Sequence, residues 1–168
     1  YARKEPAHDA LAAEFSTLID DAEDAFRRER LAGHFTASCW LVSADGQRLL
    51  LTHHRKLQRW LQLGGHADGD RDLAQVALKE AEEESGLSGL VLEDPAIFDL
   101  DKHWIPERKD VPGHWHYDVR FVIRALGGEA FVLSEESLDL AWRPVTEVAS
   151  DPQSDESMQR MARRWLAR

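Results

Sequence analysis

Residues 71–87 have the sequence RDLAQVALKEAEEESGL and form the clearest helical pattern in this chain of 168 residues. Asp70 precedes the segment and is suited to cap a helix N-terminus. Gly86 is suited to end a helix, because glycine readily adopts the left-handed conformation found there. The sequence therefore predicts a helix from about Arg71 to Ser85.

Acidic residues share the apolar side of this predicted helix. On a wheel of about 100° per residue, the apolar positions Leu73, Val76 and Ala77 fall on one arc. The acids that fall on the same arc are Glu80, Glu83 and Glu84. Carboxylates directed inward need protonation, basic partners or a cation. Oxygen ligands favour Mg²⁺ or Mn²⁺ over Zn²⁺, which predicts a divalent-cation site, and the alternative is a solvated acidic run.

The same stretch belongs to a longer motif. Residues 65–87 resemble the Nudix box, written G-x5-E-x7-R-E-U-x-E-E-x-G-U with U an aliphatic residue, in order and spacing without a gap. Residues 33–38, 60–65 and 140–142 also resemble the conserved frame of bacterial Nudix hydrolases. The resemblance covers about residues 33–147.

Two positions depart from the box. Arg71 stands where the box has its first acid, and Lys79 stands where it has its arginine. In the family that acid and arginine are thought to support the loop and the metal-binding acids, and two basic residues do not reproduce their ion pair. Asp68, Asp70 and Asp72 are neighbouring acids that we consider as substitutes.

The resemblance implies an α/β fold, a Nudix-type α/β/α sandwich with a mixed β-sheet. The helical spacing of apolar residues before residue 33 adds an N-terminal helical extension. We expect the extension in residues 1–32, the Nudix domain in residues 33–150, and a C-terminal helix in residues 151–168 packed on the same domain.

The resemblance also implies a chemistry, namely hydrolysis of a diphosphate linkage in a nucleoside diphosphate joined to another moiety. The residues implied to hold Mg²⁺, with Mn²⁺ as a second option, are Glu80, Glu83, Glu84 and the main-chain carbonyl of Gly64. Such an ion neutralises phosphate charge and lowers the pKa of a bound water. Glu83 is our candidate for ligand and water activator, and Glu135 and Glu136 are candidates for a further acid or for ordinary surface charge.

The composition limits the classes of partner. The formal net charge is -10 at pH 7, which argues against general nucleic-acid binding because that needs basic patches. The chain has one cysteine, Cys39, so no intrachain disulfide is expected. We find no apolar run of the roughly 20 residues that cross a bilayer. These features predict a cytoplasmic protein, and the resemblance implies that its partner is a small nucleotide-type diphosphate.

The remaining elements follow from periodicity and turn signals. Asp45-Gly46 predicts the turn of a hairpin, and Pro95 predicts an interruption in a later strand. Strands are expected at residues 34–43, 47–52, 60–63, 90–100, 114–125 and 131–133, and helices at residues 8–30, where one or two are possible, and 151–168.

Residues 114–121 alternate between polar and apolar side chains, as in a strand with two different faces. The polar face carries His114, His116, Asp118 and Arg120. We interpret it as a pocket wall in which His114, His116 and Arg120 contact substrate. The His-x-His spacing also permits zinc, but no cysteine or compact third ligand accompanies it in the sequence. Ordinary surface is the third interpretation.

Arg55 and His66 are further candidates for substrate binding, because they flank the segment that leads into the box; exposed loop charge is the equal alternative for Arg55. Two other functions compete. The isopentenyl-diphosphate isomerases share the Nudix fold, but their cysteine position is occupied here by Gly64. A non-catalytic Nudix domain that binds a nucleotide or a protein is supported by Arg71 and Lys79 and opposed by the intact acids.

Overall fold

The fold is built on a mixed β-sheet of eight strands. A computed structural model describes residues 8–21, 24–55, 57–108, 111–135 and 137–168. The strands are β1 (Gly33–Val42), β2 (Arg48–His54), β3 (Arg59–Leu61), β4 (Gly64–His66), β5 (Leu90–Leu92), β6 (Asp99–Ile105), β7 (His114–Ala125) and β8 (Ser137–Pro144). The helices are α1 (Asp9–Ile19), α2 (Leu73–Ser85), α3 (Val145–Val148) and α4 (Glu156–Leu166).

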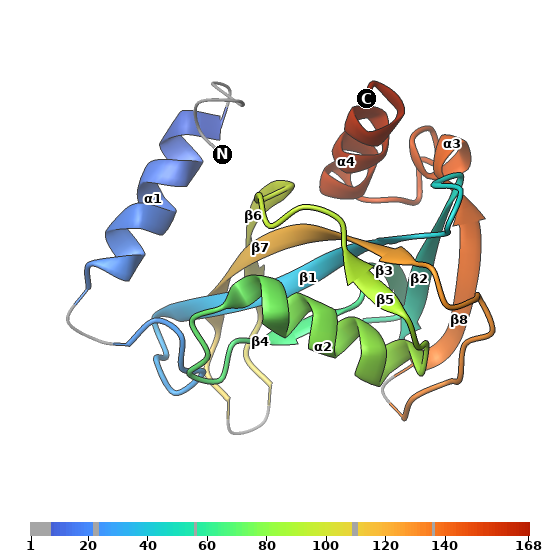
Figure 1. The fold of residues 1–168 in the computed structure, drawn as a ribbon. Coiled ribbons are helices and arrows are strands. Elements are labelled where there is room, and N and C mark those ends of the chain that lie inside the picture. Colours follow the sequence, from blue (N-terminus) through green and yellow to red (C-terminus); the bar gives the residue numbers. More distant parts are fainter. Residues whose placement is uncertain (1–7, 22–23, 56, 109–110, 136) are drawn as a thin grey trace.

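The two long strands β1 and β7 form the centre of the sheet (Figure 1). They run parallel, with a register from Gly33 opposite Trp115 to Val42 opposite Arg124. The path continues as β3-β2-β1-β7-β5, while β4 pairs with β1, β6 with β7 and β8 with β2, all antiparallel. The expected mixed sheet is therefore confirmed.

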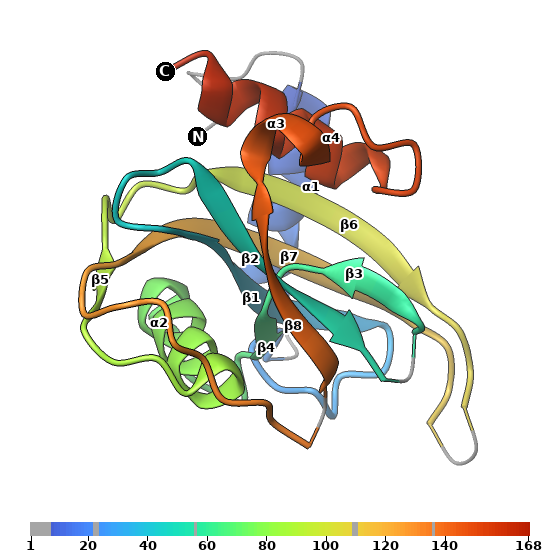
Figure 2. The ribbon, with the colours of Figure 1, turned by 90° about the vertical axis from the view of Figure 1, so that its right-hand side faces the viewer.

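Helices cover both faces of this sheet (Figure 2). All ten positions of β1 are buried, because its two faces enter two different cores. Phe35, Ala37, Cys39 and Leu41 pack in the core that includes α2. Trp40 and Val42 pack with residues of α3 and α4. The resulting α/β/α arrangement is the one that the sequence led us to expect.

The N-terminal helix is shorter than expected. α1 ends at Ile19, and the described residues 24–32 form turns and no second helix. Phe15 anchors α1, since its ring lies 5.9 Å from the ring of Phe35 and 5.2 Å from that of Tyr117. The prediction of helix up to Arg30 was wrong, because this segment instead lies against the loop before α2 and hydrogen-bonds to it.

The remaining strand predictions were partly correct. The interruption expected at Pro95 is confirmed, because residues 90–100 are divided between the short β5 and the first residues of β6, and both strands pair with β7. Residues 131–133 lie outside any strand. The strand β8 was not predicted as an element, because its pairing along β2 from Arg48–Pro144 to His54–Ser137 is a long-range contact.

The helix ends follow local chemistry. α2 is capped by Asp72, whose side chain accepts a hydrogen bond from the Gln75 amide at 3.2 Å, and Gly86 ends it at φ 65°. Asp70 instead accepts from the Asp72 amide at 2.9 Å in the preceding turn. α4 starts at Glu156 with Asp155 as its cap, five residues later than expected. None of the helices in the described ranges is both long and apolar enough to span a membrane.

Candidate active site

The acids of α2 lie along one edge of the helix where it passes β4. Glu80 and Glu84 are half-buried, whereas Glu83 is exposed. The helix buries Val76, Ala77, Ala81 and Ser85, so its buried side is rotated toward Ala81 relative to the arc expected from the wheel. Glu83 therefore lies on the flank of the helix, with its carboxylate 3.7 Å from the ammonium group of Lys79.

Gly65 of β4 lies directly against the carboxylate of Glu80. A Cβ at Gly65 would lie 2.4 Å from Cδ and 2.5 Å from Oε1 of Glu80. Such an approach of carboxylate to backbone is open only to glycine. Gly64 packs tightly against β1. A Cβ added at Gly64 would lie 2.4 Å from the Ser38 hydroxyl and 2.6 Å from the Ala37 carbonyl oxygen. The glycine pair thus allows β4 to lie between β1 and the acids of α2.

This arrangement fits a divalent cation that prefers oxygen. Glu80 and Glu84 come from one helix edge, Glu83 is beside them, and Gly65, which follows Gly64 in β4, adjoins Glu80. Carboxylate and carbonyl oxygens are the donors that Mg²⁺ and Mn²⁺ take in proteins. These residues would hold the ion at the junction of β4 and α2.

Gly65→Ala is expected to reduce Mn²⁺ affinity and activity while leaving the fold intact. The added methyl group would displace the flexible end of Glu80, and the nearest atoms to it all belong to that side chain. Mn²⁺ binding by electron paramagnetic resonance and thermal unfolding measure the two effects. Gly64→Ala is the contrast, because its methyl group would meet backbone atoms and should lower stability. Unchanged Mn²⁺ affinity in Gly65→Ala would contradict this placement of Glu80.

The two departures from the box have other partners here. Arg71 lies 3.5 Å from the carboxylate of Asp24 and stacks over the Phe26 ring at 4.8 Å. Arg28 holds Asp68 with two hydrogen bonds, of which Nε to Oδ1 measures 2.6 Å. The segment before β1 therefore braces the loop that leads into α2, a support that the box pattern alone did not reveal.

Two other predicted site residues, Arg55 and Glu135, meet each other near the start of β8. Arg55 donates to the carbonyl oxygens of Glu135 and Ser137 at 3.0 and 3.1 Å. Glu135 itself is exposed, and Glu136 lies outside the described residues. Arg55 thus joins β2 to the segment before β8, and a contact of Arg55 or Glu135 with substrate stays a prediction.

The predicted histidines do come together. His34 of β1 lies opposite His116, and the rings of His34, His66, His114 and His116 contact one another with centroids 4.9 to 5.1 Å apart. Burial is the main cause that lowers the pKa of His34, and it lowers the pKa of His66 to about 4 and that of His116 to about 2. With these pKa values, the imidazoles of His66 and His116 are neutral at pH 7. His34 was not among the predicted site residues, because nothing in the local sequence links it to His116.

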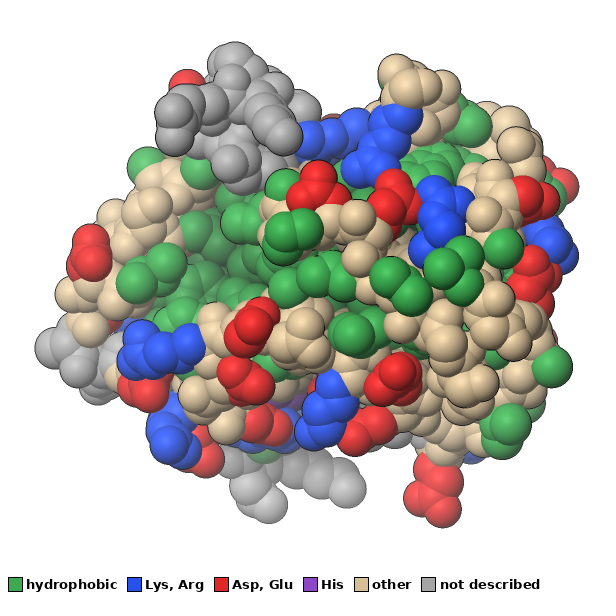
Figure 3. Space-filling view, in the orientation of Figure 1, with side chains coloured by type: hydrophobic (Ala, Val, Ile, Leu, Met, Phe, Trp, Pro, Cys, Tyr) green, Lys and Arg blue, Asp and Glu red, His purple; other side chains and the backbone are tan. Residues whose placement is uncertain are grey.

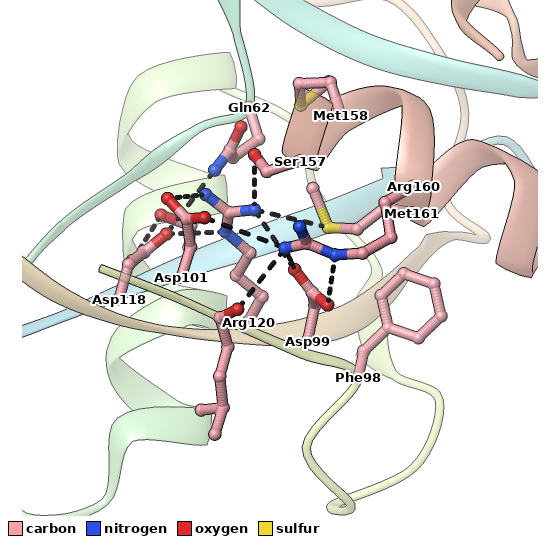
Figure 4. A network of polar contacts seen from close by, with 12 residues as sticks. Gln62, Phe98, Asp99, Asp101, Asp118, Arg120, Ser157, Met158, Arg160 and Met161 are labelled. Carbon is pink, nitrogen blue, oxygen red and sulfur yellow. Dashed lines mark hydrogen bonds and ion pairs between the residues drawn. The ribbon is translucent and has the colours of Figure 1, made fainter. Parts of the chain in front are cut away.

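Arg120 lies deeper on the same sheet face, in the polar network of Figure 4. Its side chain is 3% exposed and lies 2.7, 3.2 and 3.3 Å from the carboxylates of Asp118, Asp101 and Asp99. Burial lowers its pKa, but these carboxylates outweigh burial and raise the pKa overall. The guanidinium also donates to Ser157 of α4 at 2.9 Å. This geometry gives Arg120 a structural role, and its contact with substrate stays a prediction.

Cys39 has the environment of a core residue. It is 1% exposed in the core beneath α2, and burial raises the pKa of its thiol well above the usual value. A protonated, buried thiol is a poor nucleophile. The position that precedes Gly65 and His66 is Gly64, which offers no side chain.

A helix whose carboxylates lie beside β4, on a sheet covered by helices, defines an α/β domain whose residues fit a divalent cation with oxygen ligands. Comparison with known protein families identifies this domain. The family model of the NUDIX domain matches residues 33–165, so the chain belongs to the Nudix hydrolase family. The match extends through most of α4.

Solved structures share this fold. A NUDIX-family hydrolase from Clostridium perfringens is 20% identical, with a TM-score of 0.60 over 80% of this chain and 96% of its own. An Ap4A hydrolase from C. elegans is 17% identical, with a TM-score of 0.60 over 79% and 95%. The NUDIX domain of Shewanella oneidensis NrtR, crystallised with ADP ribose, is 18% identical, with a TM-score of 0.54 over 90% and 97%. No curated protein matches the chain.

Proposed function

We propose that the protein is a Mg²⁺-dependent pyrophosphohydrolase that cleaves the diphosphate linkage of a nucleoside diphosphate joined to another moiety. Mn²⁺ is the second candidate ion. The observation that carries the proposal is the close approach of the Glu80 carboxylate to Gly65 of β4, together with Glu83 and Glu84 on the same stretch of α2.

Each residue has a distinct role in this proposal. Glu80, Glu84 and the Gly64 carbonyl hold the cation, which when bound supplies positive charge for the phosphates and acidifies a water. Glu83, which is exposed on the flank of α2, is our candidate to bind the ion and to accept the proton of the attacking water. His66 follows Gly65 directly, so it and the neighbouring His114 and His116 are the candidates for contact with substrate.

Charge supports the need for a cation at this site. Figure 3 shows Asp and Glu interspersed with Lys and Arg on the face that carries α2, with no uniformly basic surface there. A diphosphate carries several negative charges, and the chain has a net charge of -10. A bound divalent ion would offset the repulsion between the substrate and the three acids.

The test is a panel of nucleoside diphosphates, nucleotide sugars and dinucleotides with Mg²⁺ or Mn²⁺, with product analysis to identify the bond that is cleaved. Release of a nucleoside monophosphate, abolished by chelation and restored by metal, is the expected result. One of the similar structures is an Ap4A hydrolase and another was crystallised with ADP ribose, so dinucleotides and ADP ribose belong in the panel.

The alternative is a Nudix domain that binds a nucleotide without turnover. Arg71 favours it, because the first acid of the box is absent and Arg71 pairs with Asp24. Saturable binding of a panel member with no metal-dependent cleavage would support this alternative against the hydrolase.

A further inference from the structure

Three histidines converge on the sheet face opposite the one that α2 covers. His34 comes from β1, and His114 and His116 come from β7. His34 and His116 are paired directly across the two parallel strands. One ring nitrogen of each residue lies within 4.8 Å of those of the other two. We call these three residues the histidine cluster.

Backbone carbonyls orient two of the rings. His34 Nδ1 lies 3.2 Å from the Arg30 oxygen, and His114 Nδ1 lies 2.8 Å from the Pro112 oxygen. Because a carbonyl oxygen only accepts, each Nδ1 must donate, and the neutral ring then carries its lone pair on Nε2. Histidines that bind metals commonly donate their other N–H to a carbonyl in this way.

The Nε2 atoms of the three cluster histidines have too few hydrogen-bond partners within the described part of the protein. His34 is 2% exposed, and its Nε2 has no hydrogen-bond partner among the described residues. Buried polar atoms normally have one. The Nε2 atoms of His114 and His116 are 3.1 Å apart, so a neutral pair shares at most one hydrogen bond. A cation between the rings would satisfy all three nitrogens.

The surroundings hold the cluster in place. The rings of His66 and His103 pack against that of His116 with centroids at 5.0 and 5.4 Å. Nδ1 of His103 is in turn 3.1 Å from the Asp101 carboxylate. His66 is the residue after Gly65, so the cluster adjoins the end of β4 that leads into the loop before α2.

We propose that His34, His114 and His116 form a binding site for a divalent transition-metal ion such as Zn²⁺, separate from the carboxylates of α2. Imidazole nitrogens favour Zn²⁺ and its neighbours in the first transition row, whereas Mg²⁺ prefers oxygen. At a Zn–N distance of about 2.1 Å, tetrahedral ligands are about 3.4 Å apart. The His114–His116 pair is already close to this spacing at 3.1 Å. Three protein ligands leave one position of a tetrahedral site open.

The test is Zn²⁺ binding to the full chain, free of any histidine tag and stripped with a chelator. Titration in excess Mg²⁺ against a chromogenic chelator should give one tight Zn²⁺ per chain. Co²⁺ should give the visible absorption of a tetrahedral nitrogen site, and Zn²⁺ should raise the Tm. His116→Gln is expected to weaken Zn²⁺ binding by at least about 100-fold, because it removes one of three ligands.

Two controls separate the possible outcomes. His53→Gln changes a histidine that stacks on Trp60 outside the cluster, at a centroid distance of 5.2 Å, and should bind Zn²⁺ like wild type. Glu83→Gln should also keep this Zn²⁺, whether or not the α2 acids bind Mg²⁺. Absence of stoichiometric Zn²⁺ in wild type, or unchanged affinity in a folded His116→Gln, would overturn the proposal.

Discussion

Glu83→Gln is expected to lower kcat for Mg²⁺-dependent diphosphate cleavage by about 1000-fold or more. The amide neither carries the charge that a divalent ion needs nor accepts the proton of a water. Each tenfold loss of rate corresponds to about 1.4 kcal/mol of transition-state stabilisation, and a metal ion supplies several kcal/mol. Steady-state kinetics on the best panel substrate, over a range of Mg²⁺ concentrations, measure this loss.

The fold should tolerate this change, so the loss of rate is interpretable. The Glu83 side chain is 59% exposed, and its contact with Lys79 is an exposed ion pair worth at most about 1 kcal/mol. Glu82→Gln is the matched control, because Glu82 is an exposed neighbour on the same helix with the same charge. It should keep wild-type kinetics. Equal losses in both variants would point to a general charge effect and away from a specific role of Glu83.

Arg120→Met is expected to destabilise the protein by about 3–5 kcal/mol, the cost of removing one partner from a buried ionic network. Asp99 and Asp118 have side chains that are 1% and 2% exposed, and both lie within 3.3 Å of the guanidinium. Arg160 would remain 2.6 Å from Asp99, so Asp118 would lose most. The Tm should fall by roughly 6–20 °C at neutral pH, by the usual scaling for a chain of this size.

The pH dependence of the free energy of unfolding distinguishes the effect of an unpaired buried carboxylate from simple loss of packing. In Arg120→Met, a buried carboxylate without its cation binds a proton more readily in the folded than in the unfolded state. The folded state then gains relative stability as the pH falls, so the deficit against wild type should shrink from pH 7 toward pH 5. A deficit that is constant over this range would indicate lost packing instead.

Arg163→Ala is the control for the removal of an arginine. Its guanidinium is exposed and donates to Gln159 one turn earlier on α4 at 2.7 Å. Its loss should change the free energy of unfolding by less than about 0.5 kcal/mol. Comparison of KM for a panel substrate in Arg120→Met, measured well below its Tm, tests whether Arg120 also contacts substrate.

Local sequence pattern was sufficient for the elements whose periodicity and end signals lie within the element itself. The 3.6-residue period, the acids around Glu80 and the terminal Gly86 predicted α2 to within two residues, and alternation predicted β7 at its observed bounds. These features repeat over a few residues and do not depend on a distant partner. The box spacing likewise identified the family before the sheet order was known.

The tertiary structure alone decided which distant side chains meet. The parallel register of β1 and β7 brings His34 to His116, and the sequence showed His-x-His without its third ligand. The antiparallel register of β6 and β7 and the position of α4 place Arg120 among carboxylates of two strands. Strand register is specified by the packing of whole sheet faces and by hydrogen bonds between distant segments. A short stretch of sequence therefore does not reveal it.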